Sequence, residues 1–223
     1  MIPWVHLDTA PIPGGGELRL FRRGAEFSIR LGANELMNSR LSGSEEALAT
    51  LTCDRLAGRK RARLLIGGLG MGFTLRAALA CAPADAALVV AELLPEVVAW
   101  ARGPMAELFA GSLDDPRVSV REQDVAAVIA SGTAAFDAIL LDVDNGPDGL
   151  TRPQNDALYN AAGLAAARAA LRPGGILAVW SADPDDGFTR RLRQAGFSVE
   201  EVAVKAHRGR SGRRHVIWLA QRP

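Results

Sequence analysis

Glycines and acidic residues gather at a few points of this sequence where their types and spacing could bind a nucleoside-like ligand. The run Gly67–Gly72 (GGLGMG) directly follows the short apolar stretch Arg63–Ile66 and precedes a helical pattern that begins near Thr74. Glycine permits a sharp turn and a close approach of the backbone to a ligand, because it has no Cβ. A glycine run between a strand and a helix predicts a nucleotide-type binding loop, whereas a bare tight turn is the alternative.

The glycine spacing also selects among cofactors. A dinucleotide-binding loop has the pattern Gly-x-Gly-x-x-Gly and holds pyrophosphate at a helix N-terminus. Here the pattern is Gly-x-Gly-x-Gly, no basic residue stands where phosphates would lie, and the Lys-hydroxyl pair of a P-loop is absent. The sequence therefore favours a cofactor without phosphate, S-adenosylmethionine or decarboxylated S-adenosylmethionine, with S-adenosylhomocysteine or methylthioadenosine as the product.

Acids at the ends of the next two predicted strands complete the candidate pocket. Glu92 follows Leu88–Ala91 and is placed to accept hydrogen bonds from both ribose hydroxyls, with a solvated strand-end acid as the alternative. Asp124 ends the third strand and is placed to accept from an adenine amino group, with a helix cap as the rival role. The predicted cofactor-binding residues are Gly67, Gly68, Gly70, Gly72, Glu92, Asp124 and Val125.

Asp142, at the end of the fourth predicted strand, and Asp144 are the candidate catalytic residues. Displacement at a carbon beside a sulfonium needs an aligned, deprotonated nucleophile, and an amine is protonated near neutral pH. A carboxylate can bind the ammonium ion and then accept or relay its proton. Asp148 belongs to the same loop, and because this stretch is rich in turn formers, a purely structural acidic turn is the alternative.

These residues need a sheet that aligns the carboxyl ends of its strands. From residue 62 onward, short apolar runs alternate with helical stretches, which predicts a doubly wound, mostly parallel seven-stranded α/β sheet. The last two runs have no helix between them, so the sheet is expected to end in an antiparallel hairpin. The predicted strands are Arg63–Ile66, Leu88–Ala91, Val118–Arg121, Ala138–Leu141, Ile176–Trp180, Val199–Lys205 and His215–Leu219, and the predicted helices Thr74–Cys81, Pro95–Ala110, Val125–Ser131 and Asp156–Leu171.

A small unit is predicted ahead of this domain. Residues 11–16 (PIPGGG) are expected to form a flexible connector, and Glu17–Arg23 and Glu26–Leu31 alternate apolar and polar residues as in a β-hairpin. A third short strand, Glu35–Asn38, and a helix, Ser44–Leu56, with Ser44 as a candidate cap, complete the unit. The predicted domains are 1–57, the N-terminal β-hairpin unit with its linking helix, and 58–223, a Rossmann-like domain.

Composition places the chain among globular proteins. Of its 223 residues, 48% are hydrophobic and 23% charged, which argues against disorder. The net charge of +1 gives no global attraction to nucleic acid or to a membrane. No stretch long enough to span a membrane is free of charge and proline, and the first residues do not resemble a signal peptide, so a cytoplasmic location is expected.

Cysteine and histidine usage predicts neither a disulfide nor a metal site. Cys53 and Cys81 fall in predicted helices and form no Cys-x-x-Cys pair, so buried free thiols are expected. The three histidines, His6, His207 and His215, lie far apart and show no metal-ligand spacing.

The motifs that surround the candidate pocket resemble those of the spermidine synthase family, which has the class I S-adenosylmethionine-dependent methyltransferase fold. Ile66–Arg76 is similar to that family's glycine loop running into Thr-Leu-Arg, and Ala91–Leu93 is similar to its Val-Glu-Ile. Asp114–Val118, followed by Asp124, resembles the family's Asp-Pro-Arg-Val segment and its adenine-binding acid.

The resemblance continues through the second half of the domain and covers about residues 17 to 180. Phe136–Asp142 is similar to the strand that ends in the family's catalytic aspartate, and Leu171–Leu177 to the turn into the fifth strand. The N-terminal hairpin is also a family feature. The resemblance implies a nucleoside-binding pocket, Asp142 as a catalytic residue, a polyamine as the acceptor and, since the family commonly dimerises, a homodimer.

The departures from the family fall on the polyamine side of the pocket. The family loop reads Gly-Gly-Gly-Asp-Gly-Gly, and its aspartate helps to hold the aminopropyl amine, but this loop has no acid and is one residue longer. The family's Tyr-His-Glu segment corresponds at best to Ser44–Glu46, so Tyr and His are missing. After Asp142 the family reads Ser-Ser/Thr-Asp-Pro, whereas this chain reads VDNGP over residues 143–147.

These departures leave several functions open. Loss of the loop acid favours methyl transfer to a small-molecule acceptor, with amines among the candidates. Aminopropyl transfer to an amine, the spermidine synthase activity, is the alternative, and a catalytically inactive nucleoside-binding homologue is a further one. The basic loop Lys205–Arg214 raises nucleic-acid methylation as a third hypothesis, but it has no aromatic residues for base stacking, so a solvated hairpin tip is favoured and no nucleic-acid partner is expected.

Overall fold

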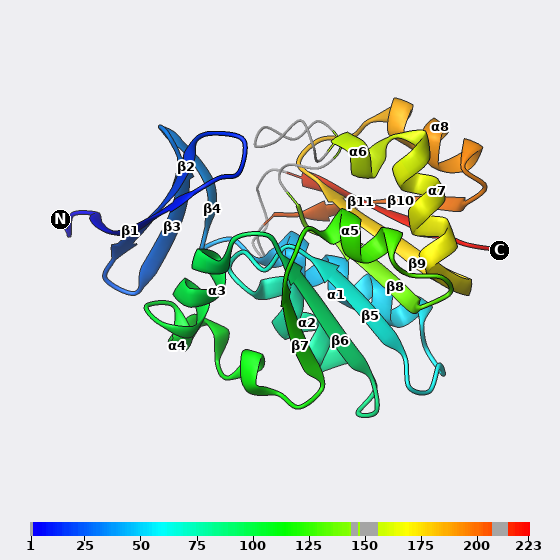
Figure 1. The fold of residues 1–223 in the computed structure, drawn as a ribbon, viewed down its shortest axis with the longest axis horizontal. Helices are drawn as coiled ribbons and strands as arrows, with labels where there is room; N and C mark the ends of the chain where they lie inside the picture. The colour runs from blue at the N-terminus through cyan, green and yellow to red at the C-terminus, as the bar shows by residue number, and fades with distance from the viewer. Residues whose placement is uncertain (1, 144–146, 148–155, 207–213) are drawn as a thin grey trace.

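Two β-sheets with flanking helices make up the protein, as a computed structural model that describes residues 2–143, 147, 156–206 and 214–223 shows (Figure 1). The smaller sheet is N-terminal and antiparallel, with the strand order β1-β2-β3-β4. The larger sheet has seven strands in the order β10-β11-β9-β8-β5-β6-β7. The strands of the small sheet are β1 (Val5–Pro11), β2 (Glu17–Arg23), β3 (Glu26–Leu31) and β4 (Asn34–Asn38).

The large sheet is parallel in its centre and antiparallel at one end, as the sequence predicts. β5 pairs in parallel with both β6 and β8, whereas β11 runs antiparallel to β9 and to β10. Its strands are β5 (Arg63–Gly67), β6 (Ala87–Glu92), β7 (Val118–Glu122), β8 (Phe136–Leu141), β9 (Leu171–Ser181), β10 (Ser198–Lys205) and β11 (Arg214–Gln221). The predicted fold class, a mostly parallel seven-stranded α/β sheet that ends in an antiparallel hairpin, is confirmed.

Helices cover both faces of the large sheet (Figure 1). Successive residues of a strand point to opposite faces, so Leu64 and Ile66 pack under α1, α2 and α3, while Leu65 packs under α5, α7 and α8. Both faces are therefore buried, which explains the continuous apolar runs of the central strands. The helices are α1 (Gly43–Arg55), α2 (Phe73–Cys81), α3 (Pro95–Arg102), α4 (Ala106–Phe109), α5 (Val125–Ala130), α6 (Asp156–Tyr159), α7 (Ala161–Ala170) and α8 (Asp186–Gln194), with a 3₁₀ turn at Ser112–Asp114.

Two predicted helices are each broken into two. The helix predicted over 95–110 ends at Arg102, because Gly103 and Pro104 follow and proline has no N–H to donate to the preceding turn. The helix predicted over 156–171 is interrupted at Asn160, whose side-chain oxygen accepts the N–H of Gly163 at 2.9 Å and so starts α7. The sequence analysis also missed α8, whose two buried apolar residues are Phe188 and Leu192.

The N-terminal unit differs from its prediction at three points. Residues 11–16 are not a flexible connector, because the Ile12 N–H donates to the Gly16 carbonyl at 3.0 Å and closes a hairpin between β1 and β2. The strand β1 is missing from the prediction, since its apolar residues Val5 and Leu7 are exposed and give no core signal. Helix α1 begins at Gly43 with Ser42 in the cap position, so Ser44 lies inside the helix rather than capping it. The predicted domain boundary after residue 57 remains a prediction.

The two cysteines are paired. The disulfide Cys53–Cys81 joins the last turn of α1 to the end of α2, so the prediction of free thiols is wrong. Sequence reasoning treats the two cysteines as separate because they lie 28 positions apart, in two different predicted helices, and form no Cys-x-x-Cys pair. The packing of α1 beside α2 brings the two Cα atoms to 6.1 Å from each other.

An ion-pair cluster holds the amino-terminal ends of the central strands together. Asp137 of β8 has a side chain only 5% exposed, and it pairs with Arg59 and with Arg172 at 2.7 Å each. Its Oδ2 also accepts the backbone N–H of Arg63 at 2.8 Å. One carboxylate therefore links the amino-terminal ends of β5, β8 and β9.

Replacing Asp137 by Ala is expected to lower the free energy of unfolding by about 2–3 kcal/mol, because it removes the ion-pair partner of two arginines and the acceptor of a partly buried N–H. Chemical denaturation followed by circular dichroism measures this loss. The Asp114→Ala variant is a matched control, since its carboxylate is 80% exposed and pairs with an exposed Arg102 at 3.2 Å. We expect the control to change the unfolding free energy by less than about 0.5 kcal/mol, and equal losses in the two variants would refute the structural importance of the Asp137 cluster.

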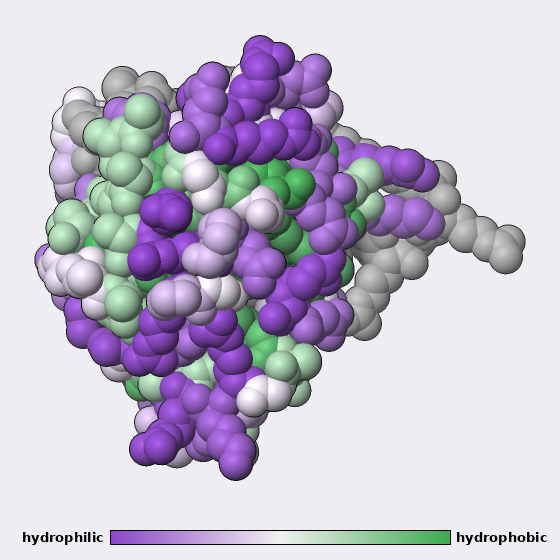
Figure 2. Space-filling view, turned by 90° about the vertical axis from the view of Figure 1, so that its right-hand side faces the viewer, coloured by the Kyte–Doolittle hydropathy of each residue, from purple (hydrophilic) through white to green (hydrophobic). Residues whose placement is uncertain are grey.

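The surface that carries the C-terminus mixes hydrophilic and hydrophobic residues (Figure 2). It is most strongly hydrophilic along the top, where α8 lies, because α8 exposes Arg190 and Arg193 and buries its apolar side. Within the described part of the chain, no helix combines the length and apolar character needed to cross a membrane.

Candidate functional site

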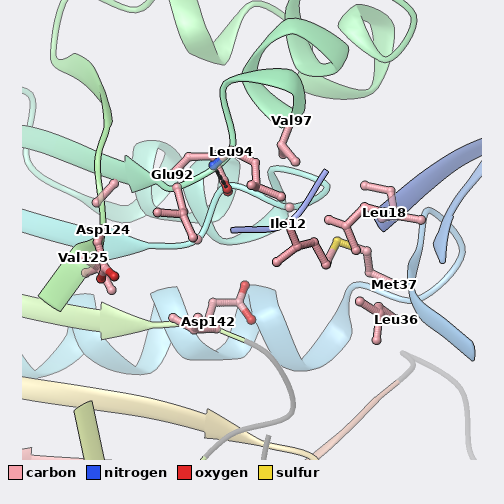
Figure 3. Close-up of a pocket in the computed structure, with 16 residues that line it drawn as sticks. Ile12, Leu18, Leu36, Met37, Glu92, Leu94, Val97, Asp124, Val125 and Asp142 are labelled. Carbon is pink, nitrogen blue, oxygen red and sulfur yellow. Dashed lines mark hydrogen bonds between the residues drawn. The ribbon is translucent and has the colours of Figure 1, made fainter. Parts of the chain in front are cut away.

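A cavity of about 150 Å³, partly open to solvent, lies at the carboxyl ends of β5, β6 and β8 (Figure 3). The small sheet forms its other wall. Its lining residues are Ile12, Leu18, Ile29, Leu36, Met37, Gly68, Gly70, Ala91, Glu92, Leu93, Leu94, Val97, Asp124, Val125, Asp142 and Val143. Six residues predicted from the sequence therefore meet in one cavity: Gly68, Gly70, Glu92, Asp124, Val125 and Asp142.

The glycine loop brings the backbone of β5 close to that of β8. Gly68 has φ +88°, and a Cβ at this position would lie 2.5 Å from the carbonyl oxygen of Asp142. The Asp142 N–H donates to the Gly67 carbonyl at 3.0 Å, and the Gly68 N–H donates to the Ala91 carbonyl at 2.9 Å. Only glycine fits this conformation and this close approach, so the loop holds three strand ends in register.

Gly67 and Gly72 have a different position from the other loop glycines, because neither lines the cavity. A Cβ on Gly67 would meet Val125 at 2.9 Å, and one on Gly72 would meet the ring of Phe109 at 2.4 Å. Both glycines therefore allow close packing behind the loop. Their predicted contact with a cofactor remains a prediction.

Glu92 ties the glycine loop to the end of β6. Its Oε2 accepts the N–H of Leu69 at 2.9 Å, and its Oε1 accepts the N–H of Leu94 at 3.0 Å. Burial raises the pKa of this carboxyl, while the backbone N–H donors of Leu94 and Leu69 oppose the rise. Each carboxylate oxygen has a second lone pair, so Glu92 can hold the loop and still accept hydroxyl groups from a ligand in the cavity.

Asp124 lines the cavity and also caps a helix. Its Oδ1 accepts the N–H of Ala126 at 2.8 Å, which places it at the N-cap of α5. The cap that sequence analysis kept as a rival is thus present. The capping bond uses one oxygen, and a role toward adenine stays a prediction. Val125, next to it, is buried and forms part of the cavity floor beside Gly67.

Asp142 lies where the cavity meets the N-termini of α1 and α2. Thr74, in the first turn of α2, donates from Oγ1 to Asp142 Oδ2 at 2.6 Å and lies 3.5 Å from the carbonyl oxygen of Glu45. Burial raises the pKa of Asp142, and the Thr74 hydroxyl opposes the rise. Burial, followed by the charge of Asp142, raises the pKa of Glu45 to about 7. Two carboxyls whose pKa values are raised, Asp142 and Glu45, therefore lie at this end of the cavity.

Sequence analysis did not select Glu45, Thr74 or Ser44 as site residues. Ser44 entered as a candidate helix cap and, with Glu45, as a weak counterpart of the family's Tyr-His-Glu segment. Thr74 entered as the start of a helix and as part of the Thr-Leu-Arg match. Their position in the fold could have indicated them, because α1 and α2 both begin at the edge of the sheet where the candidate acidic residues lie. Asp144, the second predicted catalytic residue, Asp148 and residues 207–213 of the basic loop lie outside the described residues.

The small sheet supplies an apolar wall that sequence analysis also missed. Ile12, Leu18, Ile29, Leu36 and Met37 face the cavity, and the Met37 sulfur lies 3.2 Å from where a Cβ on Gly70 would be. The sheet is anchored to the main domain by the indole N–H of the buried Trp100, which donates to Asp8 at 2.7 Å. In the described part of the chain, no group of three or more His, Cys, Asp and Glu residues is arranged to hold a metal ion.

Comparisons with known proteins find sequence relatives and similar folds, although no protein-family model matches the chain. Polyamine aminopropyltransferases of two Mycobacterium tuberculosis strains and of Mycobacterium bovis are each 34% identical to it over 153 residues. The chain resembles the spermidine synthases. The match covers 65% of this chain and 28% of each relative, so the chain spans less than a third of the length of these curated relatives.

Solved structures give the same spermidine synthase-like fold. Spermidine synthase from Thermotoga maritima has a TM-score of 0.77 at 19% identity and matches 98% of this chain and 73% of its own. Spermidine synthase in complex with the transition state analogue AdoDATO has a TM-score of 0.76 at 18% identity, over 98% of this chain and 72% of its own. TrmN from Thermus thermophilus matches with a TM-score of 0.54 at 20% identity, over 80% of this chain and 48% of its own. The methyltransferase-type fold inferred from the sequence is thereby confirmed.

Proposed function

We propose that the chain transfers the aminopropyl group of decarboxylated S-adenosylmethionine to a small amine and releases methylthioadenosine. The observation that carries this proposal is the position of Asp142, a carboxyl with a raised pKa at the mouth of a cavity whose other end has the residues expected for a nucleoside. The sequence relatives named polyamine aminopropyltransferase support the same reaction class. A small amine is a cation, and carboxyls are the side chains that recognise it.

The nucleoside half of the substrate is assigned to the glycine-loop side of the cavity. Glu92 accepts the ribose hydroxyls while its backbone donors keep it fixed, and Asp124 faces the adenine edge with Val125 against the ring. The apolar side chains of the small sheet cover the cavity from the other side and exclude water from the sulfonium. The sulfonium supplies the leaving group, because it becomes a neutral thioether when the carbon–sulfur bond breaks.

The amine half is assigned to Asp142 and its neighbours. Asp142 binds the acceptor ammonium, and a carboxylate in this position removes a proton so that the nitrogen lone pair can attack the carbon attached to sulfur. Thr74 holds the Asp142 carboxyl in place through its 2.6 Å hydrogen bond. The proposal retains the small-molecule acceptor that the sequence predicts. A homodimer and a cytoplasmic location remain predictions.

Methyl transfer from S-adenosylmethionine is the second candidate, and one observation favours it. The positions between the loop glycines are occupied by Leu69 and Met71, both buried, so the loop offers no acid to the amine of an aminopropyl group. The sequence analysis preferred methyl transfer for this reason. The comparisons support aminopropyl transfer more strongly, since the matching sequence relatives are aminopropyltransferases by name.

Calorimetric titration with S-adenosylmethionine, decarboxylated S-adenosylmethionine and methylthioadenosine separates these candidates. We expect the decarboxylated cofactor to bind at least about tenfold more tightly than the carboxylated one, a difference of about 1.4 kcal/mol. Turnover is then assayed with the decarboxylated cofactor and a panel of amines that includes putrescine, and methylthioadenosine is quantified by chromatography. Tighter binding of S-adenosylmethionine, with methyl transfer to an amine, would replace the proposal by its rival. Binding without turnover of either cofactor would indicate the inactive homologue.

The Glu92→Gln variant tests the ribose assignment in the same titration. A neutral amide accepts with only one of its two end atoms, so methylthioadenosine affinity is expected to fall by about 10- to 100-fold, which corresponds to about 1.4–2.7 kcal/mol. The Glu122→Gln variant is a suitable control, because Glu122 ends the neighbouring strand β7 at an exposed position. Unchanged affinity in Glu92→Gln would place the ribose elsewhere.

A further inference from the structure

One end of the cavity is apolar. Side chains of the small sheet and of the turn between β1 and β2 form this apolar wall, namely Ile12, Leu18, Ile29, Leu36 and Met37. Figure 3 shows Leu18, Leu36 and Met37 together on the side of the cavity that lies away from Asp124 and Val125. The cavity therefore has two chemically different ends.

The apolar wall belongs to the packed interior of the protein. Ile29 is fully buried, and Leu18 and Ile12 are each only 7% exposed. Met37 meets the glycine loop, since its sulfur lies 3.2 Å from where a Cβ on Gly70 would be. The small sheet thus packs directly on the loop, and the wall has a fixed position beside it.

The charged residues of the cavity lie away from this wall. Among the described residues that line the cavity, the acids are Glu92, Asp124 and Asp142, and none is basic. The proposed function assigns Glu92 and Asp124 to the nucleoside. Asp142 lies between the nucleoside end and the apolar wall (Figure 3). It is therefore the one acid in the described lining that is left for an acceptor.

Glu35 is the acid nearest to the wall in the sequence, because it precedes Leu36 in β4, but it does not line the cavity. Its carboxylate instead accepts from Ser28 at 2.7 Å, from Asn38 at 2.9 Å and from Arg40 at 3.1 Å. These partners hold the carboxylate away from the cavity. The charge of Glu35 is thus not presented to a molecule at the apolar wall.

The wall selects an acceptor by the end that does not react. If the ammonium of the acceptor binds Asp142 and the nucleoside fills the other end of the cavity, the rest of the acceptor meets the apolar wall. Burial of a hydrocarbon group there is favourable, whereas burial of a second ammonium without an oppositely charged partner is unfavourable.

We propose that the acceptor is a primary monoamine whose other end is an uncharged hydrocarbon group bound by the apolar wall. The proposal rests on the proposed aminopropyl transfer and names its acceptor class. Asp142 takes one proton from the ammonium, and the nitrogen lone pair forms the new C–N bond to the aminopropyl carbon. The C–S bond breaks, and its electron pair stays on sulfur. The products are methylthioadenosine and a secondary amine that carries the aminopropyl group, and the proton on Asp142 passes to water.

Pentylamine and putrescine are a matched pair of acceptors for the test. They have the same number of non-hydrogen atoms, and pentylamine has a methyl group where putrescine has its second ammonium. With decarboxylated S-adenosylmethionine and wild-type protein, we expect kcat/KM for pentylamine to exceed that for putrescine by at least about tenfold. From propylamine to pentylamine, kcat/KM should rise about three- to fourfold per methylene, because each methylene is buried against the wall. Release of methylthioadenosine measures both rates.

Met37→Glu and Leu36→Glu each place a carboxylate in the wall at a half-buried position. The ratio of kcat/KM for pentylamine to that for putrescine should fall about 100-fold, because the second ammonium gains a partner of opposite charge. Met37→Leu keeps the wall apolar and should keep the preference for pentylamine. Leu41→Glu is the matched control, since Leu41 is 41% exposed and does not line the cavity, and it should leave the ratio unchanged. Titration with methylthioadenosine shows whether each variant is folded.

The outcomes distinguish failure of this proposal from failure of the proposed function. A kcat/KM for putrescine that equals or exceeds that for pentylamine would leave aminopropyl transfer in place and overturn the monoamine assignment. An unchanged ratio in both glutamate variants, when they bind methylthioadenosine like wild type, would also overturn it. If wild type binds the cofactor but turns over neither amine, the proposed function fails and the acceptor class fails with it. The comparison of the two amines in wild type needs no variant to fold.

Discussion

Asp142→Asn is expected to lower kcat for amine transfer by about 10³-fold while leaving methylthioadenosine affinity within about threefold of wild type. The substitution keeps the shape of the side chain and an oxygen that can accept from Thr74, whose hydroxyl lies 2.6 Å from Asp142 Oδ2. It removes the charge that holds the acceptor ammonium and the oxygen that takes its proton. Steady-state kinetics with the decarboxylated cofactor, together with calorimetry, measure the two quantities separately.

The control for this variant is Asp115→Asn. Asp115 is also an aspartate in an ion pair, with Arg117 at 2.9 Å, but it belongs to the turn before β7 and does not line the cavity. The pH dependence separates the two roles of Asp142. If it acts mainly as a general base, the rate of Asp142→Asn should recover at high pH, where the amine is already deprotonated; if it acts mainly by binding the ammonium ion, the rate should recover little. A kcat equal to that of wild type would remove Asp142 from the mechanism.

The central part of the fold could be predicted because each piece has a local signal. Short apolar runs define β5, β6 and β8, and the glycine run between β5 and α2 fixes the edge of the sheet at which ligands bind. Six of the predicted site residues consequently meet in one cavity. Their proximity follows from topology, because parallel strands bring their carboxyl ends to one edge.

The parts that could not be predicted depend on contacts between distant segments. The hydrogen bond between Ser44 and His215, for example, joins residues that are 171 positions apart, and no sequence motif marks either of them. The strand β1 has exposed apolar residues and is defined mainly by its pairing with β2. The Cys53–Cys81 pair likewise depends on how α1 packs beside α2. Sequence patterns indicate which residues are buried and where turns lie. Contacts between distant segments form only in the complete fold, so these patterns do not reveal them.

The glycine loop is the second place where a single substitution should have a large effect. In Gly68→Ala, the new Cβ would lie 2.5 Å from the carbonyl oxygen of Asp142, and the residue would keep a φ of +88°, which non-glycine residues rarely adopt. The clash is with backbone rather than with a flexible side chain, so the end of β5 or the Asp142 backbone must shift. We expect the free energy of unfolding to fall by about 3–4 kcal/mol and methylthioadenosine affinity to fall by at least about 100-fold.

Gly58→Ala isolates the contribution of the close approach in Gly68→Ala. Gly58 has nearly the same backbone angle, φ +85°, but a Cβ there would have nothing within 4 Å. This control should lose only the conformational cost of a left-handed residue, about 1–2 kcal/mol, and should bind methylthioadenosine like wild type. The difference between the losses in unfolding free energy of the two variants then measures the free-energy cost of moving Gly68 away from the Asp142 backbone. Because the same contact sets the position of the Asp142 carboxyl, any Gly68→Ala protein that still binds nucleoside should lose kcat more than affinity. Equal stability losses in the two variants, with intact binding, would mean that the loop has room for a Cβ and that the register of β5 and β8 does not depend on glycine.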